Sequence, residues 1–182
     1  LGRPVAICLG LGANAGSHDG AGVFEEYLGG VSIQKGVCLC AAAGNEAEAR
    51  HHTGGVLRPG EPPGQVDLKV GENAGDVYMA VWNTVADRLS VSVRSPSGEL
   101  VGRVPAKPGI GPAADVKLVL EAARVQVEYH FPVEGSGGQL TVIRILGATP
   151  GVWNIQLHGD ILLNGSYQVW LPMTGFVAPS VE

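Results

Sequence analysis

The spacing of apolar residues changes near residue 64 of this chain. Before that point, continuous apolar runs at residues 4–9 and 37–43 flank a segment of helical spacing that begins near Asp19. A continuous apolar run is typical of a strand buried on both faces, and a right-handed crossover lays two such strands parallel. We therefore predict a buried strand, a helix capped by Asp19 and closed by Gly29-Gly30, and a second buried strand.

After residue 64, apolar and polar residues alternate, which predicts strands with one buried face. The dipeptide Asn164-Gly165 between two apolar runs is a strong hairpin signal. Many short strands at regular spacing predict an antiparallel β-sandwich, which we assign to the jelly-roll type. The expected strands cover residues 66–70, 77–82, 89–94, 99–104, 116–120, 125–131, 139–146, 152–158 and 161–171.

The predicted fold class is therefore mixed, with a partial α/β unit of strand, helix and strand followed by an antiparallel β-sandwich. We place the first unit at residues 1–57, a stiff linker rich in Pro and Gly at 58–64, the sandwich at 65–175, and a return toward the first unit at 176–182. Two parallel strands and one helix bury too little apolar surface to fold alone. We expect a piece of a longer protein whose first unit is poorly ordered or forms a homodimer through its unpaired strands.

Composition and charge narrow the expected partners. The 182 residues are 45% hydrophobic and carry a net charge of −5, which favours a soluble globular protein. The 12 Lys and Arg residues are scattered and outnumbered by 17 Asp and Glu, so we expect no nucleic-acid partner. No apolar run approaches the ~20 residues of a membrane-spanning helix, so we expect no membrane partner.

The three cysteines favour neither a disulfide framework nor a metal site. Cys38 and Cys40 point to the same face of one strand, a poor geometry for pairing with each other, and Cys8 lies in the other strand. We expect all three to be buried thiols in a sheet core. The sequence contains no metal-ligand spacing, and we expect neither a metal nor a cofactor.

Asn45 is the main candidate for a functional side chain. It follows the second buried run, and open α/β sheets place their chemistry at the carboxyl ends of such strands. A carboxamide held there can donate a hydrogen bond to a developing oxyanion. On position alone, an Asn in an ordinary turn is the other interpretation.

Two segments also resemble a known family. The run Val5-Ala6-Ile7-Cys8-Leu9-Gly10 resembles the strand of subtilisin-like serine proteases that ends in Ser-Leu-Gly, and residues 42–46 resemble their Ala-Ala-Gly-Asn-Glu segment. Residues 12–20 and 44–55 are similar to the clostridial branch, the Csp-type germination proteases, whose catalytic domain carries a jelly roll inserted after the oxyanion Asn.

The resemblance implies roles for seven residues and a protein or peptide substrate. Asn45 would form the oxyanion hole, Cys8, Leu9 and Gly10 would pair with the substrate backbone, and Ala42, Ala43 and Gly44 would form a wall of the primary specificity pocket. The family's catalytic Asp, His and Ser lie in segments that this sequence lacks. We therefore expect a fragment of a bacterial serine endopeptidase, spore-associated or secreted, that is inactive by itself.

The histidines are interpreted as structural. Ser17-His18-Asp19 contains the residue types of a triad, but consecutive side chains in a loop cannot form the relay geometry. We expect His51-His52 to have a structural role at the junction of the two units, with a pH-sensitive contact as the alternative. His130 and His158 are expected to be ordinary strand residues.

The tryptophans provide the rival hypothesis. If Trp82, Trp153 and Trp170 were exposed, the sandwich would be a non-catalytic binding or adhesion module that stacks on carbohydrate. We expect a core role instead, because large aromatic side chains anchor sandwich interiors.

Overall fold

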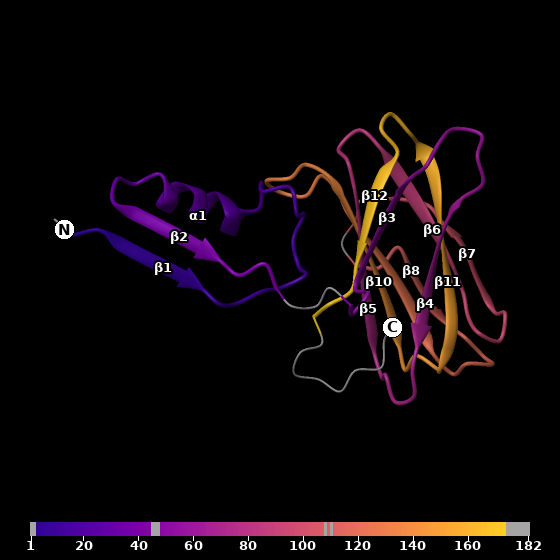
Figure 1. Cartoon of the computed structure of the whole chain (residues 1–182). Helices are drawn as coiled ribbons and strands as arrows, with labels where there is room; N and C mark the ends of the chain where they lie inside the picture. Colours follow the sequence, from indigo (N-terminus) through magenta and orange to yellow (C-terminus); the bar gives the residue numbers. More distant parts are fainter. Residues whose placement is uncertain (1–2, 45–47, 108, 110, 174–182) are drawn as a thin grey trace.

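The computed structural model describes residues 3–44, 48–107, 109 and 111–173. These residues form one helix and twelve strands in three sheets (Figure 1). The elements are β1 (Val5–Leu9), α1 (Val23–Ser32), β2 (Val37–Ala41), β3 (His52–Val56), β4 (Gly64–Val70), β5 (Val77–Asn83), β6 (Arg88–Arg94), β7 (Leu100–Val104), β8 (Ala114–Lys117), β9 (Arg124–His130), β10 (Gln139–Leu146), β11 (Gly151–Ile161) and β12 (Ser166–Trp170).

The first unit is the predicted strand, helix and strand. β1 and β2 pair in parallel, with Val5 opposite Val37 and Leu9 opposite Ala41. The helix differs from the prediction at both ends. Its N-cap is Gly22 and makes no side-chain cap, whereas the Asp19 carboxylate accepts the N–H of Ala21 and closes a turn in the preceding loop.

The C-terminal end of the helix also differs from the prediction. Gly29 and Gly30 lie inside α1, which continues to Ser32. The Ser32 hydroxyl donates to the Gly29 carbonyl oxygen at 2.8 Å. Helical hydrogen bonding therefore continues through the glycine pair, although glycine weakens a helix interior.

The prediction of two fully buried strands and buried thiols is wrong for this chain. Cys8, Cys38 and Cys40 are all exposed. Phe24 and Tyr27 of α1 are 64% and 69% exposed. One helix over two strands covers a single face of the pair, and the described residues contribute no second layer. Pairing with a second copy stays a prediction.

Two antiparallel sheets form the rest of the described chain. One has six strands in the order β3-β12-β5-β10-β9-β8, and the other has four in the order β4-β11-β6-β7. The predicted alternation is confirmed, because every second residue of β4, β9 and β10 is buried. Val81 and Val127 of the first sheet and Ile155 and Leu157 of the second belong to one apolar core.

Strand β3 shows where the expected division of the chain differs from the structure. It lies inside the range 1–57, yet it pairs with β12 at the edge of the six-stranded sheet. Residues 57–63 therefore connect one sandwich sheet to the other. Gly54 and Gly55 allow this pairing, because a Cβ at either position would lie within 3 Å of Tyr167 atoms.

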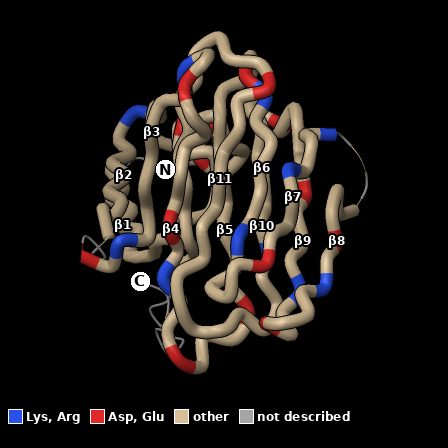
Figure 2. Tube along the Cα trace, turned by 90° about the vertical axis from the view of Figure 1, so that its right-hand side faces the viewer, with Lys and Arg blue, Asp and Glu red and all other residues tan. Residues whose placement is uncertain are grey.

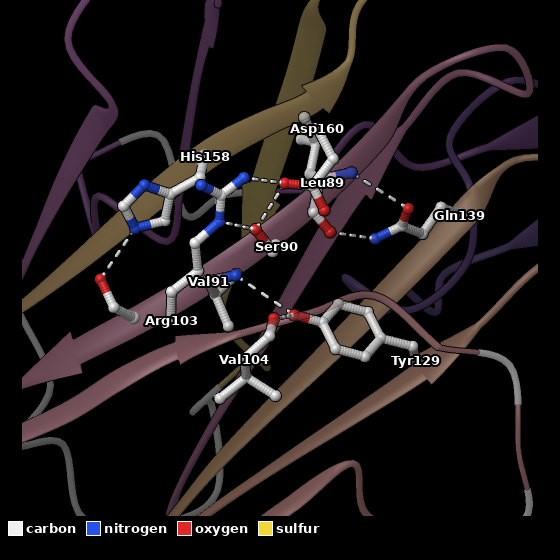
Figure 3. Close-up of polar contacts among 10 residues, drawn as sticks. Leu89, Ser90, Val91, Arg103, Val104, Tyr129, Gln139, His158 and Asp160 are labelled. Carbon is white, nitrogen blue, oxygen red and sulfur yellow. Dashed lines mark hydrogen bonds and ion pairs between the residues drawn. The ribbon is translucent and has the colours of Figure 1, made fainter.

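Two buried polar side chains connect the sheets (Figure 3). The Tyr129 hydroxyl donates to the Val104 carbonyl oxygen at 2.6 Å and accepts the Val91 N–H at 3.2 Å. The Gln139 amide, 0% exposed, bonds both backbone groups of Leu89. Because buried polar groups are costly unless paired, these contacts favour one relative position of the sheets.

The charged residues lie largely in loops and at strand ends, with both signs interspersed (Figure 2). Among the described residues, no helix has the length and apolar character needed to cross a membrane. The same residues contain no group of three or more His, Cys, Asp and Glu side chains placed to hold a metal ion.

Candidate functional site

The carboxyl ends of β1 and β2 are directed toward the sandwich (Figure 1). The loop that leaves β1 reaches the six-stranded sheet, where the Asn14 side-chain amide donates to the Leu171 carbonyl oxygen at 3.0 Å. The His18 ring stacks on the Trp170 indole, with centroids 3.8 Å apart and planes 9° apart. The loop is therefore held by the C-terminal end of β12.

Trp170 is enclosed by two imidazoles. The His52 ring stacks on it at 3.9 Å and 25°, and the His52 Nε2 lies 2.6 Å from the Gln168 Oε1. His52 comes from β3 and His18 from the first unit, so the stack joins the two parts of the chain. The predicted structural role of the His51-His52 pair at the junction fits this contact, while the pH-sensitive alternative stays untested.

A cleft of about 460 Å³ lies where the strand ends meet the sandwich. Its walls come from the loop after β1, the segment after β2, the start of β3 and the end of β12. The lining residues are Gly12, Ala13, Asn14, Ala42, Ala43, Gly44, Arg50, His51, His52, Trp170 and Met173. An adjoining, more apolar cleft of about 550 Å³ shares Gly12 and Trp170 and continues over Tyr78 and Val142 of the six-stranded sheet.

The structure brings together some of the predicted site residues. Ala42, Ala43 and Gly44 line the cleft. The Ala42 N–H donates to the Leu9 carbonyl oxygen at 3.0 Å, which holds the end of β1 beside this wall. Gly44 has φ +89°, a conformation that favours glycine.

Other predicted residues lie elsewhere. Cys8, Leu9 and Gly10 are not among the lining residues of the cleft. Cys8 pairs in register with Cys40 on the exposed strand pair. Asn45 lies outside the described residues.

The other eight lining residues were not predicted as site residues, among them Arg50, Trp170 and Met173. Arg50 is exposed and has φ +53°, and none of the described carboxylates forms an ion pair with it. No local pattern marks Arg50 or Met173. Trp170 was considered only as a core or sugar-stacking residue. Its contact with His18 of the first unit joins residues near opposite ends of the chain, and no local sequence pattern marks such a contact.

The prediction that Ser17-His18-Asp19 forms no relay is confirmed. The Ser17 hydroxyl donates directly to the Asp19 carboxylate, which also lowers the pKa of Asp19. The His18 ring is stacked on Trp170 instead.

A second group of Ser, His and Asp side chains lies on the four-stranded sheet (Figure 3). The His158 Nε2 lies 3.0 Å from the Ser92 hydroxyl, and burial together with Arg103 lowers the pKa of His158. The Asp160 carboxylate instead accepts hydrogen bonds from Ser90 and Arg103. Because Asp160 orients Ser90 and Arg103 and not the imidazole, this group does not form a catalytic relay.

The tryptophans do not form an exposed platform for sugar rings. Trp153 is 0% exposed and belongs to the apolar core, as predicted. Trp82 is 8% exposed, but it follows the core residue Val81 on the opposite face of β5 and is not part of that core. Trp170 has its two ring faces covered by His18 and His52. Stacking on carbohydrate requires a free ring face, and these three side chains offer none.

Comparisons with known proteins give a likeness to a solved structure. No protein-family profile matches the chain, and no curated protein matches it. Among solved structures, the CspB protease of Clostridium perfringens superimposes with a TM-score of 0.79 at 25% sequence identity. The likeness covers 93% of this chain and 35% of that chain, so the chain spans about a third of its neighbour's length. These values support a relation to a Csp-type protease at the level of the fold.

Proposed function

We propose that this chain is part of a subtilisin-like serine endopeptidase of the Csp type. In this proposal residues 3–44 belong to the catalytic domain, and the sandwich is its inserted jelly roll. The observation that carries the proposal is the likeness to a protease over 93% of the chain, which includes both the strand pair and the sandwich. The position of Ala42, Ala43 and Gly44 in a cleft at the strand ends supports it.

The proposed mechanism is acyl transfer. The backbone of Cys8, Leu9 and Gly10 would pair with an extended substrate beside the cleft, and the wall at residues 42–44 would accept one side chain within it. A Ser nucleophile, activated by His and Asp from segments of the longer protein, would attack the scissile carbonyl. The Asn45 carboxamide would then donate a hydrogen bond to the carbonyl oxygen as it becomes negative.

Replacing Asn45 in the longer protein tests this role. Asn45→Ala should lower kcat by ~10²–10³-fold with little change in KM, because the hydrogen bond forms only in the transition state. Asn154→Ala is the matched control, since it removes a carboxamide from β11 and should leave kcat unchanged. Cleavage of a fluorogenic peptide gives both constants. Undiminished turnover by Asn45→Ala would exclude the oxyanion role.

We further propose that the sandwich holds the substrate-binding strand in place. The contacts of Asn14 with Leu171 and of His18 with Trp170 fix the loop that follows β1. Removing residues 52–170 from the longer protein, and joining the ends with a flexible linker, should lower both stability and activity. If stability, maturation and activity were all unchanged, this role of the sandwich would be wrong.

A further inference from the structure

We infer that the cleft at the strand ends selects a substrate segment with an acidic side chain, and that the sandwich supplies the selecting charge. This inference rests on the proposed function, because it names the substrate class of the proposed peptide site. Small residues 42–44 form one wall of the cleft, while Arg50 and His52 on another wall come from the sandwich side of the junction.

The charge lining the cleft has one sign. Arg50 is always protonated, and no Asp or Glu is among the described lining residues. A carboxylate entering the cleft would therefore meet a guanidinium and no opposing acid. A Lys or Arg side chain would meet a like charge instead.

Arg50 also forms no ion pair with any of the described residues. Arg103, Arg124 and Arg144 each form an ion pair with a carboxylate of the sandwich. In the described part of the chain Arg50 has no such partner, although it lies beside the cleft. A guanidinium presents donors in a planar fork that matches a carboxylate in two parallel hydrogen bonds.

The remaining walls limit the size and position of the guest. Residues 42–44 carry at most a methyl group, which leaves room for one extended side chain within about 460 Å³. The Trp170 ring is held between His18 and His52, so this wall cannot swing aside without breaking two stacks. We therefore expect the methylene groups of a Glu to lie against the small wall and its carboxylate to reach Arg50.

Binding of matched peptides to the 182-residue chain tests the inference. The probes are three capped tetrapeptides with the sequence Ala-Ala-Ala-X, in which X is Glu, Gln or Lys. Chemical shifts of the Gly12 and Gly44 amides and of the Trp170 indole report binding in the cleft. The Glu peptide should bind about tenfold more tightly than its Gln isostere, since a charge-assisted pair replaces a neutral one.

Variants of Arg50 separate charge from shape. Arg50→Gln should remove the preference for Glu over Gln, and Arg50→Glu should favour the Lys peptide. Arg58→Gln is the control, because Arg58 is an exposed guanidinium near Glu61 in the loop after β3, outside the cleft. In the longer protein, the same ratios are measured as kcat/KM for cleavage after residue X.

The outcomes distinguish this inference from the proposed function. Equal binding of the Glu and Gln peptides, with shifts at Gly12 and Gly44, would overturn the acidic preference and leave a peptide site. Preference for Glu that survives in Arg50→Gln would overturn the role of Arg50. If the longer protein cleaved none of the peptides, and none shifted Gly12, Gly44 or the Trp170 indole, both proposals would be overturned.

Discussion

The His18 imidazole lies flat against the Trp170 indole, with centroids 3.8 Å apart and ring planes 9° apart. His18 precedes the single described helix, and Trp170 ends the last described strand. The contact joins residues from opposite ends of the chain at the cleft. The other face of the Trp170 indole is covered by His52, so this one indole links the strand pair to the sandwich.

Loss of the Trp170 ring should loosen the first unit without unfolding the sandwich. Each aromatic stack contributes about 0.5–1.5 kcal/mol, and Trp170→Ala removes two of them. Amides of β1 and β2 should exchange with solvent about tenfold faster or more in this variant, while those of β10 should be little changed. Hydrogen exchange followed by NMR measures both.

Two further variants make the test specific. His18→Ala removes the His18–Trp170 stack and keeps the His52–Trp170 stack, so the amides of β1 should exchange faster in this variant as well. His130→Ala, at the end of β9, should leave β1 unchanged. Unaltered exchange of β1 in both Trp170→Ala and His18→Ala would show that the stack does not hold the two parts together.

The Asp87 carboxylate should be a large contributor to stability. It is 0% exposed and accepts the backbone N–H groups of Leu163, Asn164 and Gly165 at 2.6, 3.0 and 2.7 Å. Although burial raises its pKa, these bonds and that from Thr84 hold the pKa of Asp87 below its ordinary value. Asp87→Ala should lower the free energy of unfolding by ~3 kcal/mol, because one buried and two partly buried backbone donors lose their acceptor.

Urea unfolding at neutral pH checks this loss. Asp67→Ala is a suitable comparison, because Asp67 is exposed and accepts a side-chain hydrogen bond from half-buried Asn154 on β11. Asp67→Ala should lower the free energy of unfolding by much less than Asp87→Ala. Similar losses for the two variants would contradict the anchoring by Asp87 of the turn between β11 and β12.

Because of Glu121, the free energy of unfolding should decrease as the pH becomes acidic. The Thr149 hydroxyl hydrogen bond, together with the Ser97 N–H that donates at 2.7 Å, lowers the pKa of Glu121 to about 2, although burial acts in the opposite direction. A carboxyl group whose pKa is lower in the folded state stabilises the fold above its ordinary pKa, here 4.5. This stabilisation should be lost as the pH falls from about 4.5 to 2.

Urea midpoints between pH 2 and 7 measure this dependence. Glu121→Gln should give a flatter profile than the wild-type chain below pH 4.5. Glu72→Gln, which alters an exposed side chain on another turn, should keep the wild-type slope. An unchanged slope in Glu121→Gln would assign the acid sensitivity to other groups.

The Tyr129 hydroxyl should stabilise the packing of the two sheets. Tyr129→Phe leaves the buried Val104 carbonyl oxygen and Val91 N–H without their shared partner, at a cost of about 1–3 kcal/mol. Tyr78→Phe removes a hydroxyl from a side chain that is 42% exposed and should be nearly neutral. Thermal unfolding of the two variants gives the comparison, and equal melting temperatures would contradict this prediction.

Gly165 should tolerate no side chain, for two separable reasons. Its φ is +79°, and a Cβ there would lie 2.1 Å from the Leu57 carbonyl oxygen. Gly147 has a similar φ of +65° with no atom within 4 Å of its Cβ position. Gly147→Ala should cost only the backbone strain of about 1–2 kcal/mol, and Gly165→Ala clearly more. If urea unfolding gave equal losses of unfolding free energy for Gly147→Ala and Gly165→Ala, Leu57 would move aside at little cost.

Local pattern was sufficient to predict much of the fold. The alternation at residues 139–146 placed β10 with its observed bounds. The turn at Asn164-Gly165 is present, but the predicted hairpin is wrong, because β11 and β12 on either side of it lie in different sheets and do not pair. β8 was predicted at residues 116–120 but lies at Ala114–Lys117, because pairing with β9 sets its bounds. β3 was missed, since His52-Thr53-Gly54-Gly55-Val56 has no alternation and becomes a strand by pairing with β12.

The sequence by itself therefore determined the two kinds of unit, the parallel pairing of the first two strands and the small residues that follow them. Periodicity acts over a few residues and can be recognised without knowing the neighbours of a strand. Only the tertiary structure decided that Trp170 lies between His18 and His52, that Arg50 faces the same cleft as Ala42, and that the thiols are exposed. These relationships depend on which distant segments pack together, and no spacing within one segment encodes that choice.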